Sequence, residues 1–449
     1  MPVKRRLRDS PPSGALLLRW VAAAVRALTG PPARAARGTA RRVADPARQV
    51  RAYFSSERVT VRQAFFAVCV AALTSLVAGL TLAGMENRIE DVEGLFVLIP
   101  VSIGMRGNIF GALSARLGTS IHSGLFEVSR NKQGLLSQNI YAAMLLTLST
   151  SVTMGVLARG IASLLSIPTV SIWDFIVVAL VGGLISSAVV LALTIYLSVT
   201  SFRRGWDLDS VGAPLITAIG DVVTLPSILV ASYLVGIGGL TPAVGGLSLV
   251  AGAVALYRGW SSAQAVVRRL IRESFPVLCV AIVLDVLAGT VVEPRVEPVF
   301  GLFKAFFVIL PGFLEITGAL GGILAARLGS KLHLGAVSPS AKPEAAALLD
   351  GAIVLILGVT VYALIAASSL AIAELLGYGY PGALRFVGVT MTGGLLATVV
   401  ASFIGYYAAI VTFRFGFDPD NHTIPLVTSG MDLLGAICLV VALVIFGVA

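Results

Sequence analysis

The 449-residue sequence has little charge and few cysteines or histidines. Asp, Glu, Lys and Arg make up 12% of it, whereas hydrophobic residues make up 57%. The charged share is about half that of an ordinary soluble domain. A soluble protein of this length could not bury many apolar runs of about 20 residues. The scarcity of charge therefore excludes a soluble globular protein and predicts an all-α polytopic membrane protein.

Sequence patterns for catalysis are also missing. Cys69, Cys279 and Cys438 lie inside apolar runs without a CxxC spacing, which is typical of small buried side chains. The sequence has no HExxH, Walker, GxSxG or Cys/His zinc-site pattern. We therefore predict that the chain is not an enzyme.

The net charge of +10 is explained by membrane topology rather than by nucleic-acid binding. Of the 33 Lys and Arg residues, 13 lie within the first 58 positions, and most of the others lie near the ends of apolar runs. We predict a basic cytoplasmic arm over residues 1–60 and no nucleic-acid partner.

Apolar runs predict eleven membrane-spanning helices, each long enough to cross a bilayer. The predicted spans are residues 63–83, 94–118, 136–165, 172–201, 212–236, 240–258, 275–293, 299–329, 344–375, 381–412 and 423–448.

The charges of the loops predict the orientation of these spans, because Lys and Arg are retained on the cytoplasmic side. Basic segments alternate with acidic or short ones. The basic segments are the N-terminal arm, residues 116–132, 203–204, 258–272, 327–342 and Arg414, and the others are residues 86–93, 293–297 and 378–385. An odd number of spans fits this alternation. The pattern predicts a plasma-membrane protein with a cytoplasmic N-terminus and an extracytoplasmic C-terminus.

Self-comparison reveals an internal repeat at a constant offset of 211 residues. Residues 115–118 and residues 326–329 both read Ala-Arg-Leu-Gly, and Asp221 matches Asp432. We predict a first five-helix repeat over residues 61–237, a linker helix over residues 238–260 and a second repeat over residues 261–449. The linker makes the two repeats parallel, related by a pseudo-two-fold axis along the membrane normal.

Asp221 and Asp432 are the strongest candidates for metal ligands. Each lies about ten residues into its predicted span, which is about 15 Å along a helix and near mid-membrane. A carboxylate at this depth costs several kcal/mol unless it meets water, a partner or a cation. The other interpretation is a protonated Asp that hydrogen-bonds a neighbouring helix. Paired carboxylates suit a hard divalent cation, and they could hold Mg²⁺ through its hydration shell.

The second span of each repeat is interrupted by Pro and Gly. This pattern fits a broken helix that lines a pore, and it fits equally well small residues that only allow close helix packing. The candidate pore or ion ligands are Asn108, Glu315, Gly107 and Gly318 on these spans, together with Asp285 on the seventh helix.

Five further acidic residues are weaker candidates. Asp285 lies at mid-span in the seventh helix and has no acidic counterpart in the first repeat. Asp207, Asp209, Asp418 and Asp420 precede the fifth spans on the predicted cytoplasmic side. There they could cap helices, concentrate cations at a mouth, or do both.

Two stretches carry a family resemblance: residues 104–117, which include Gly107 and Asn108, and residues 418–432, which read Asp-Pro-Asp-Asn and continue through Pro425, Thr428 and Ser429 to Asp432. They resemble the signatures of the MgtE family of divalent cation transporters, and in particular its two-repeat members related to the solute-carrier magnesium transporters. The resemblance covers about residues 60–449.

The resemblance implies transport of Mg²⁺ or related divalent cations along a path lined by the second and fifth helices, with Asp221 and Asp432 at the ion site. Family dimers pair two five-helix units, so it also implies a monomeric pseudo-dimer. The second repeat departs from the pattern, because Ala319 stands where the first has Asn108, with Glu315 as a candidate substitute. The chain also lacks a soluble region long enough for cytoplasmic magnesium-sensing and CBS domains.

We therefore expect a divalent cation transporter or channel whose partners are the lipid bilayer and the cation, with Mg²⁺ as the expected cargo. The alternatives are a proton- or Na⁺-coupled secondary transporter of another solute and a non-transporting membrane scaffold.

Overall fold

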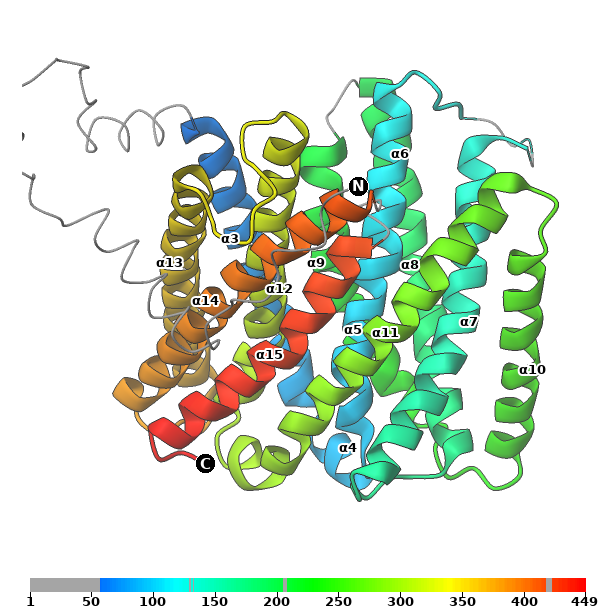
Figure 1. The fold of residues 1–449 in the computed structure, drawn as a ribbon. Coiled ribbons are helices and arrows are strands. Elements are labelled where there is room, and N and C mark those ends of the chain that lie inside the picture. The colour runs from blue at the N-terminus through cyan, green and yellow to red at the C-terminus, as the bar shows by residue number, and fades with distance from the viewer. Residues whose placement is uncertain (1–56, 129–130, 132, 205–207, 417–421) are drawn as a thin grey trace, which may run out of the picture.

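The computed structural model describes residues 57–128, 131, 133–204, 208–416 and 422–449. The regular elements in these residues are helices, and eleven of the described helical segments are long and apolar enough to cross a membrane. This confirms the predicted all-α polytopic membrane protein with eleven spans. The long helices lie side by side, with the start of α3 (Arg58–Gly84) and the C-terminus at opposite ends of the bundle (Figure 1).

The five spans of the first repeat begin with α3, and the second span contains a π-helical turn. The remaining helices of this repeat are α4 (Glu86–Asp91), η1 (Leu95–Val97), α5 (Leu98–Arg106), η2 (Gly107–Gly111), α6 (Ala112–His122), α7 (Leu135–Leu164), α8 (Ile172–Arg204) and α9 (Leu208–Ser232).

The linker and the second repeat have longer elements. They are α10 (Leu240–Trp260), α11 (Ala265–Arg295), η3 (Val296–Gly301), α12 (Ala305–His333), α13 (Ala345–Leu376), α14 (Ala383–Phe415) and α15 (Ile424–Ile445).

The second spans of the two repeats differ in local helix geometry. In the first repeat a π-helical turn, η2, connects α5 to α6 within one continuous span, at the Gly-rich segment of the sequence. In the second repeat α12 is continuous through Pro311. A proline removes a single helical hydrogen bond, and here it stands only six residues after the start of the helix. Both second spans are therefore continuous helices, and the first differs from the second by its local π-helical segment.

The seventh span, α11, is longer at both ends than its apolar run. The basic segment expected as a loop is mostly helical, because only residues 261–264 separate α10 from α11. The turn expected at residues 293–297 is helical too, since α11 runs to Arg295 and continues as η3. Arg and Glu are good helix formers, so the hydrophobic run marks the apolar layer and not the ends of the helix.

Helix packing relates the two repeats reciprocally. The first helix of each repeat packs against the second helix of the other, α3 against α12 and α11 against α5. Glycines allow both approaches. A Cβ atom placed at Gly79 would lie 2.0 Å from the Val308 carbonyl oxygen, and one at Gly289 would lie 2.8 Å from the Val97 carbonyl oxygen. Val97 and Val308 are repeat-matched, so the interface has the local pseudo-two-fold symmetry that parallel repeats require.

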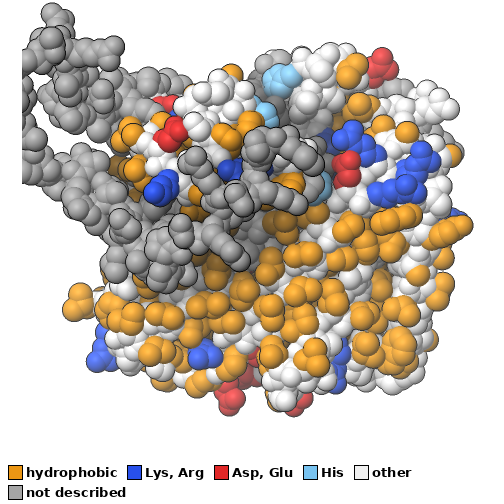
Figure 2. All heavy atoms as spheres, viewed as in Figure 1, with side chains coloured by type: hydrophobic (Ala, Val, Ile, Leu, Met, Phe, Trp, Pro, Cys, Tyr) orange, Lys and Arg blue, Asp and Glu red, His pale blue; other side chains and the backbone are white. Residues whose placement is uncertain are grey.

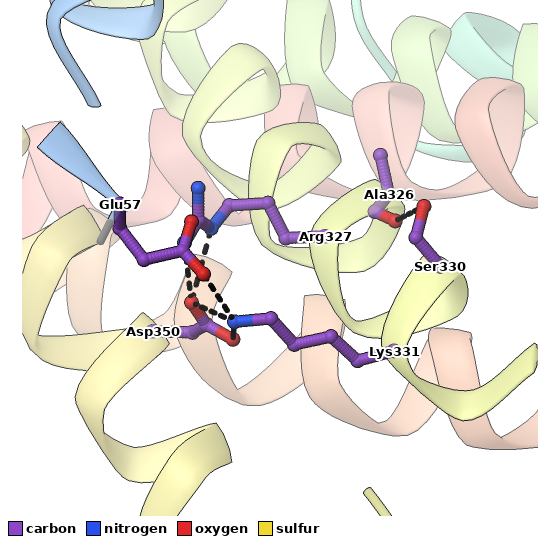
Figure 3. Close-up of polar contacts among 6 residues, drawn as sticks. All are labelled: Glu57, Ala326, Arg327, Ser330, Lys331 and Asp350. Carbon is purple, nitrogen blue, oxygen red and sulfur yellow. Dashed lines mark hydrogen bonds and ion pairs between the residues drawn. The ribbon is translucent and has the colours of Figure 1, made fainter. Parts of the chain in front are cut away.

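An ion-pair cluster ties α12 and α13 of the second repeat to the residue that precedes α3 of the first repeat (Figure 3). Buried Asp350 of α13 lies 2.7 Å from Arg327 Nη2 and 2.8 Å from Lys331 Nζ, and both cations also contact Glu57. At the matched place in the first repeat the acceptor is a neutral amide: Arg116 Nε donates to Asn139 Oδ1 at 3.1 Å.

The molecular surface has the pattern of a membrane protein. Hydrophobic side chains form a band across the middle of the face shown in Figure 2, and charged side chains gather toward its two ends. The linker helix α10 is the least buried span, at 28% of its apolar window, which fits its place at the side of the bundle (Figure 1).

Candidate functional site

Asp221 lies in the middle of α9 and is only 1% exposed. Neither of its carboxyl oxygens accepts a hydrogen bond from the described residues. Its carboxyl group faces that of Glu315, and Asp432 lies within electrostatic reach. The structure therefore brings together the two repeat-matched aspartates that the sequence singles out, with Glu315 beside them.

Glu315 projects from α12 toward the first repeat. It is half-buried, and it accepts a hydrogen bond from the Ser75 hydroxyl of α3. Glu315 also lies within electrostatic reach of Asp432. Glu315 thus bridges the two repeats.

Asp432 of α15 has an acidic neighbour of its own. Its half-buried carboxyl group faces that of Asp285 on α11, with the Ser429 hydroxyl beside them. Asp285 is fully buried, and neither of its carboxyl oxygens accepts a well-aligned hydrogen bond from the described residues. Asp285, a weaker candidate ion ligand from the sequence, thus lies beside Asp432 in the central group.

Asn108 contacts the fifth helix of the other repeat. Its side-chain amide donates to Ser429 Oγ at 3.2 Å, and its carbonyl oxygen accepts from Thr428 Oγ1 at 3.1 Å. Asn108 is 7% exposed and belongs to the π-helical turn η2. The π-helical turn of the second span therefore directs this amide across the interface.

The candidate glycines lie at close helix contacts. A Cβ atom at Gly107 would lie 3.3 Å from the Thr217 methyl carbon, and one at Gly318 would lie 3.4 Å from the Thr428 Cα atom. Thr217 and Thr428 are repeat-matched, so each second helix approaches the fifth helix of its own repeat through glycine. This geometry accounts for both glycines by packing.

The central carboxyl groups form two facing pairs, Asp221 with Glu315 and Asp285 with Asp432. Among the described residues, no three His, Cys, Asp or Glu side chains are arranged to hold a bare metal ion. Two carboxylates about 4 Å apart repel by about 4 kcal/mol at an effective dielectric constant of about 20. Such pairs are stable in a membrane interior only when a cation or a proton balances their charge.

A small cavity adjoins the site on the side where α15 begins. Its lining residues come from the second and third spans of the first repeat and from α11 and α15: Asn108, Ile109, Ala112, Arg116, Leu146, Ser274, Leu278 and Pro425. Asn108 thus faces open space as well as Thr428 and Ser429.

Most of the predicted cytoplasmic mouth lies outside the described residues. Asp207, Asp418 and Asp420 fall in the gaps at 205–207 and 417–421, and Asp209 is described only as part of the α9 backbone. Their predicted role remains a prediction.

The sequence reasoning missed Ser75 and Arg106. Ser75 lies next to Thr74 in an otherwise apolar span, and this pair of hydroxyl residues was the available signal. Arg106 lies within the Gly104–Asn108 motif, where an arginine in a membrane span was the available signal. In the structure Arg106 is 1% exposed and donates to Ser187 Oγ of α8, and it forms no ion pair with a described carboxyl group.

The sequence matches the MgtE family, described as a divalent cation transporter, over residues 99–231 and again over residues 310–442. The two segments begin and end 211 residues apart, which is the offset of the internal repeat. No solved structure matches the chain.

The chain is also similar to curated members of the solute carrier family 41. Member 3 of Rattus norvegicus is 22% identical over 409 residues, which span 84% of this chain and 85% of that protein. Member 3 of Mus musculus is 22% identical over 377 residues, spanning 77% of this chain and 74% of that protein. Member 2 of Xenopus laevis is 23% identical over 393 residues, spanning 79% of this chain and 65% of that protein.

These matches confirm the predicted two-repeat transporter and the prediction that the chain is not an enzyme. The two family matches cover more than half of the chain, one in each repeat. The chain therefore belongs to the MgtE family of divalent cation transporters.

Proposed function

We propose that the protein moves Mg²⁺ across the membrane along a path between its two repeats, with Asp221 and Asp432 as the central ion ligands. This proposal is supported by two repeat-matched carboxyl groups, one from each repeat, that lie within electrostatic reach of each other, with Glu315 beside Asp221. Both lie on fifth helices, α9 and α15, in a chain of a divalent cation transporter family.

The chemistry of the site favours a hydrated divalent cation. Mg²⁺ prefers oxygen ligands and loses its water reluctantly, so it is usually held by one or two carboxylates with several waters retained. Carboxyl groups that form facing pairs rather than one closed cage suit such an ion. The Asn108 amide and the hydroxyl groups of Thr428 and Ser429 provide further oxygen atoms nearby.

We propose further that the protein is a multi-pass protein of the plasma membrane with its N-terminus in the cytoplasm. The positive-inside rule supports this orientation, since Arg204, Arg258 and Lys331 lie at or near helix ends on the side of the bundle where α3 begins. A single chain contains both copies of the repeat, so a monomer is sufficient to form the path.

Uptake of Mg²⁺ into proteoliposomes tests the ion site. We expect Asp221→Asn and Asp432→Asn each to lower the uptake rate by at least about tenfold, which corresponds to about 1.4 kcal/mol. Asp174→Asn is the matched control, because Asp174 is a buried acid at the start of α8 that accepts hydrogen bonds from Ser171 and Gly236 instead. Its uptake should stay near that of the wild type.

Three other results would reject the proposal. Normal uptake by both central variants would exclude Asp221 and Asp432 as ligands. Movement of an organic solute driven by a proton or Na⁺ gradient, with no Mg²⁺ flux, would favour the secondary-transporter alternative. No flux of any kind would favour a scaffold.

A further inference from the structure

We propose that Asp285 pairs with Asp432 in the same way that Glu315 pairs with Asp221. The transported cation then passes between two equivalent carboxyl pairs. This inference rests on the proposed function. It adds Asp285 and Glu315 to the ion site as residues of equal weight, although they do not correspond in the repeat.

The two partner acids, Glu315 and Asp285, come from different positions of the repeat. At the offset of 211 residues, Glu315 of α12 corresponds to Gly104 of α5, and Asp285 of α11 corresponds to Thr74 of α3. The first repeat therefore lacks an acid on its second helix, and the second repeat has an additional acid on its first helix. The helix without the acid packs against the helix that carries the extra acid: α5, with Gly104, packs against α11, with Asp285, and α3, with Thr74, packs against α12, with Glu315.

The geometry shows that the two changes compensate each other in space. A Cβ atom placed at Gly104 would lie 2.6 Å from Asp285 Oδ2 and 3.5 Å from Asp432 Oδ2. The Asp285 carboxyl group therefore fills the volume that an acidic side chain at residue 104 would enter. Glycine at this position leaves room for it.

Burial gives the pairs the same internal order. In each pair one carboxyl group is fully buried, Asp221 or Asp285, and the other is half-buried, Glu315 or Asp432. The two half-buried groups lie within electrostatic reach of each other. A cation between Glu315 and Asp432 would thus have two further buried carboxyl groups close by, Asp221 next to Glu315 and Asp285 next to Asp432.

The buried members are not explained by structural hydrogen bonding. Neither Asp221 nor Asp285 has a well-aligned hydrogen bond to its carboxyl oxygens from the described residues, and their polar neighbours are mainly the other acids of the group. None of the four acids forms an ion pair with a described Lys or Arg residue. A buried charge without a partner is strongly unfavourable, so these groups are suited to a cationic cargo.

Exchanging the position of the acid tests the inference directly. We expect Asp285→Thr, which installs the first repeat's residue, to lower Mg²⁺ uptake by at least about tenfold. Adding Gly104→Glu to this variant should recover uptake to within about threefold of the wild type, because it gives Asp432 the same partner that Asp221 has. Gly104→Glu alone should transport poorly, since its side chain meets Asp285.

The conservative variant and the mirror variant complete the test. Asp285→Asn keeps the size and hydrogen-bonding capacity of the side chain, so a purely structural role predicts normal uptake, whereas a ligand role predicts a loss like that of Asp285→Thr. In the other pair, Glu315→Gly combined with Thr74→Asp should transport better than Glu315→Gly alone. Size-exclusion profiles in detergent establish which variants fold.

The possible failures are distinguishable. Normal uptake by Asp285→Asn, or no recovery in both exchanged pairs when they fold, overturns the inference. If Asp221→Asn and Asp432→Asn also transport normally, the proposed function fails with it. Loss in those two variants together with normal uptake by Asp285→Asn overturns the inference alone.

Discussion

Arg106 shows how one residue distinguishes the two repeats. Its guanidinium group is buried between α5 and α8, with Nε and Nη2 unpartnered among the described residues. At the matched position in the second repeat, Thr317 shares a hydrogen bond with the Tyr362 hydroxyl at 2.7 Å. Tyr362 itself corresponds to Ser151. The second helix therefore fills this region with a long side chain in one repeat, and the third helix fills it in the other.

Two matched glycines make room for these long side chains. A Cβ atom at Gly183 would lie 3.1 Å from Arg106 Nη2, and one at Gly394 would lie 2.3 Å from the Tyr362 ring. The space is thus conserved between the repeats while its content changes from a cation to an aromatic ring. The charge of Arg106 is not required for packing, because the second repeat packs the same space without it.

We expect Arg106→Met to leave the stability unchanged or to raise it. A buried charge without a counter-ion costs several kcal/mol, and methionine fills a similar volume without that cost. The measurement is the apparent melting temperature in detergent, with Ser187→Ala as the control for the hydrogen bond. A fall in melting temperature larger than that of the control would mean that the guanidinium group has a stabilising partner in the membrane.

At the scale of elements, the ion-pair cluster that joins α12 to α13 and α3 has a built-in comparison in the first repeat (Figure 3). Asn139, Arg116 and Ser120 of the first repeat correspond to Asp350, Arg327 and Lys331. The first repeat therefore makes the same helix contact with one cation and a neutral amide.

We expect Asp350→Asn to destabilise the protein by about 3 kcal/mol, because two partly buried cations lose their closest carboxylate. Adding Lys331→Ser should recover much of this loss, since the double variant has the first repeat's composition. The check is thermal unfolding of purified protein in detergent, followed by size-exclusion chromatography. Equal stability of Asp350→Asn and the wild type would contradict the assigned role of the cluster.

The sequence predicts elements well where the bilayer sets their length. Eleven apolar runs give eleven spans because each must cross about 30 Å of hydrocarbon, whereas the ends of α11 are missed because helical Arg and Glu lie beyond that layer. The repeat identifies Asp221 and Asp432 by their matched positions. It names Asp285 only as a weaker candidate, because the approach of Asp285 to Gly104 depends on a contact between α11 and α5 of the other repeat, which no offset within the sequence reveals.

At the scale of the whole molecule, central contacts join the two repeats, although the pair Asp285 and Asp432 lies within the second. Asp221 of the first repeat faces Glu315 of the second, and Asn108 of the first contacts Thr428 and Ser429 of the second. The linker α10 lies at the side of the bundle and contributes no residue to the central group. Its contribution is to bring α11 back to the side where α3 begins, which makes the repeats parallel (Figure 1).

This arrangement predicts that neither repeat transports alone, and that a covalent link between them is dispensable. Division of the chain in the short loop at residues 261–264 gives a first fragment with α3 to α10 and a second with α11 to α15. We expect no Mg²⁺ uptake from either fragment alone and restored uptake when both are expressed together, because the reciprocal packing of α3 on α12 and α11 on α5 can reassemble the interface. Co-expression of a first fragment that carries Asp221→Asn is the control and should abolish the recovery. Uptake by either fragment alone would contradict this prediction. It would mean that a single repeat pairs with a second copy of itself to form a complete path, and that transport does not need the different positions of Glu315 and Asp285.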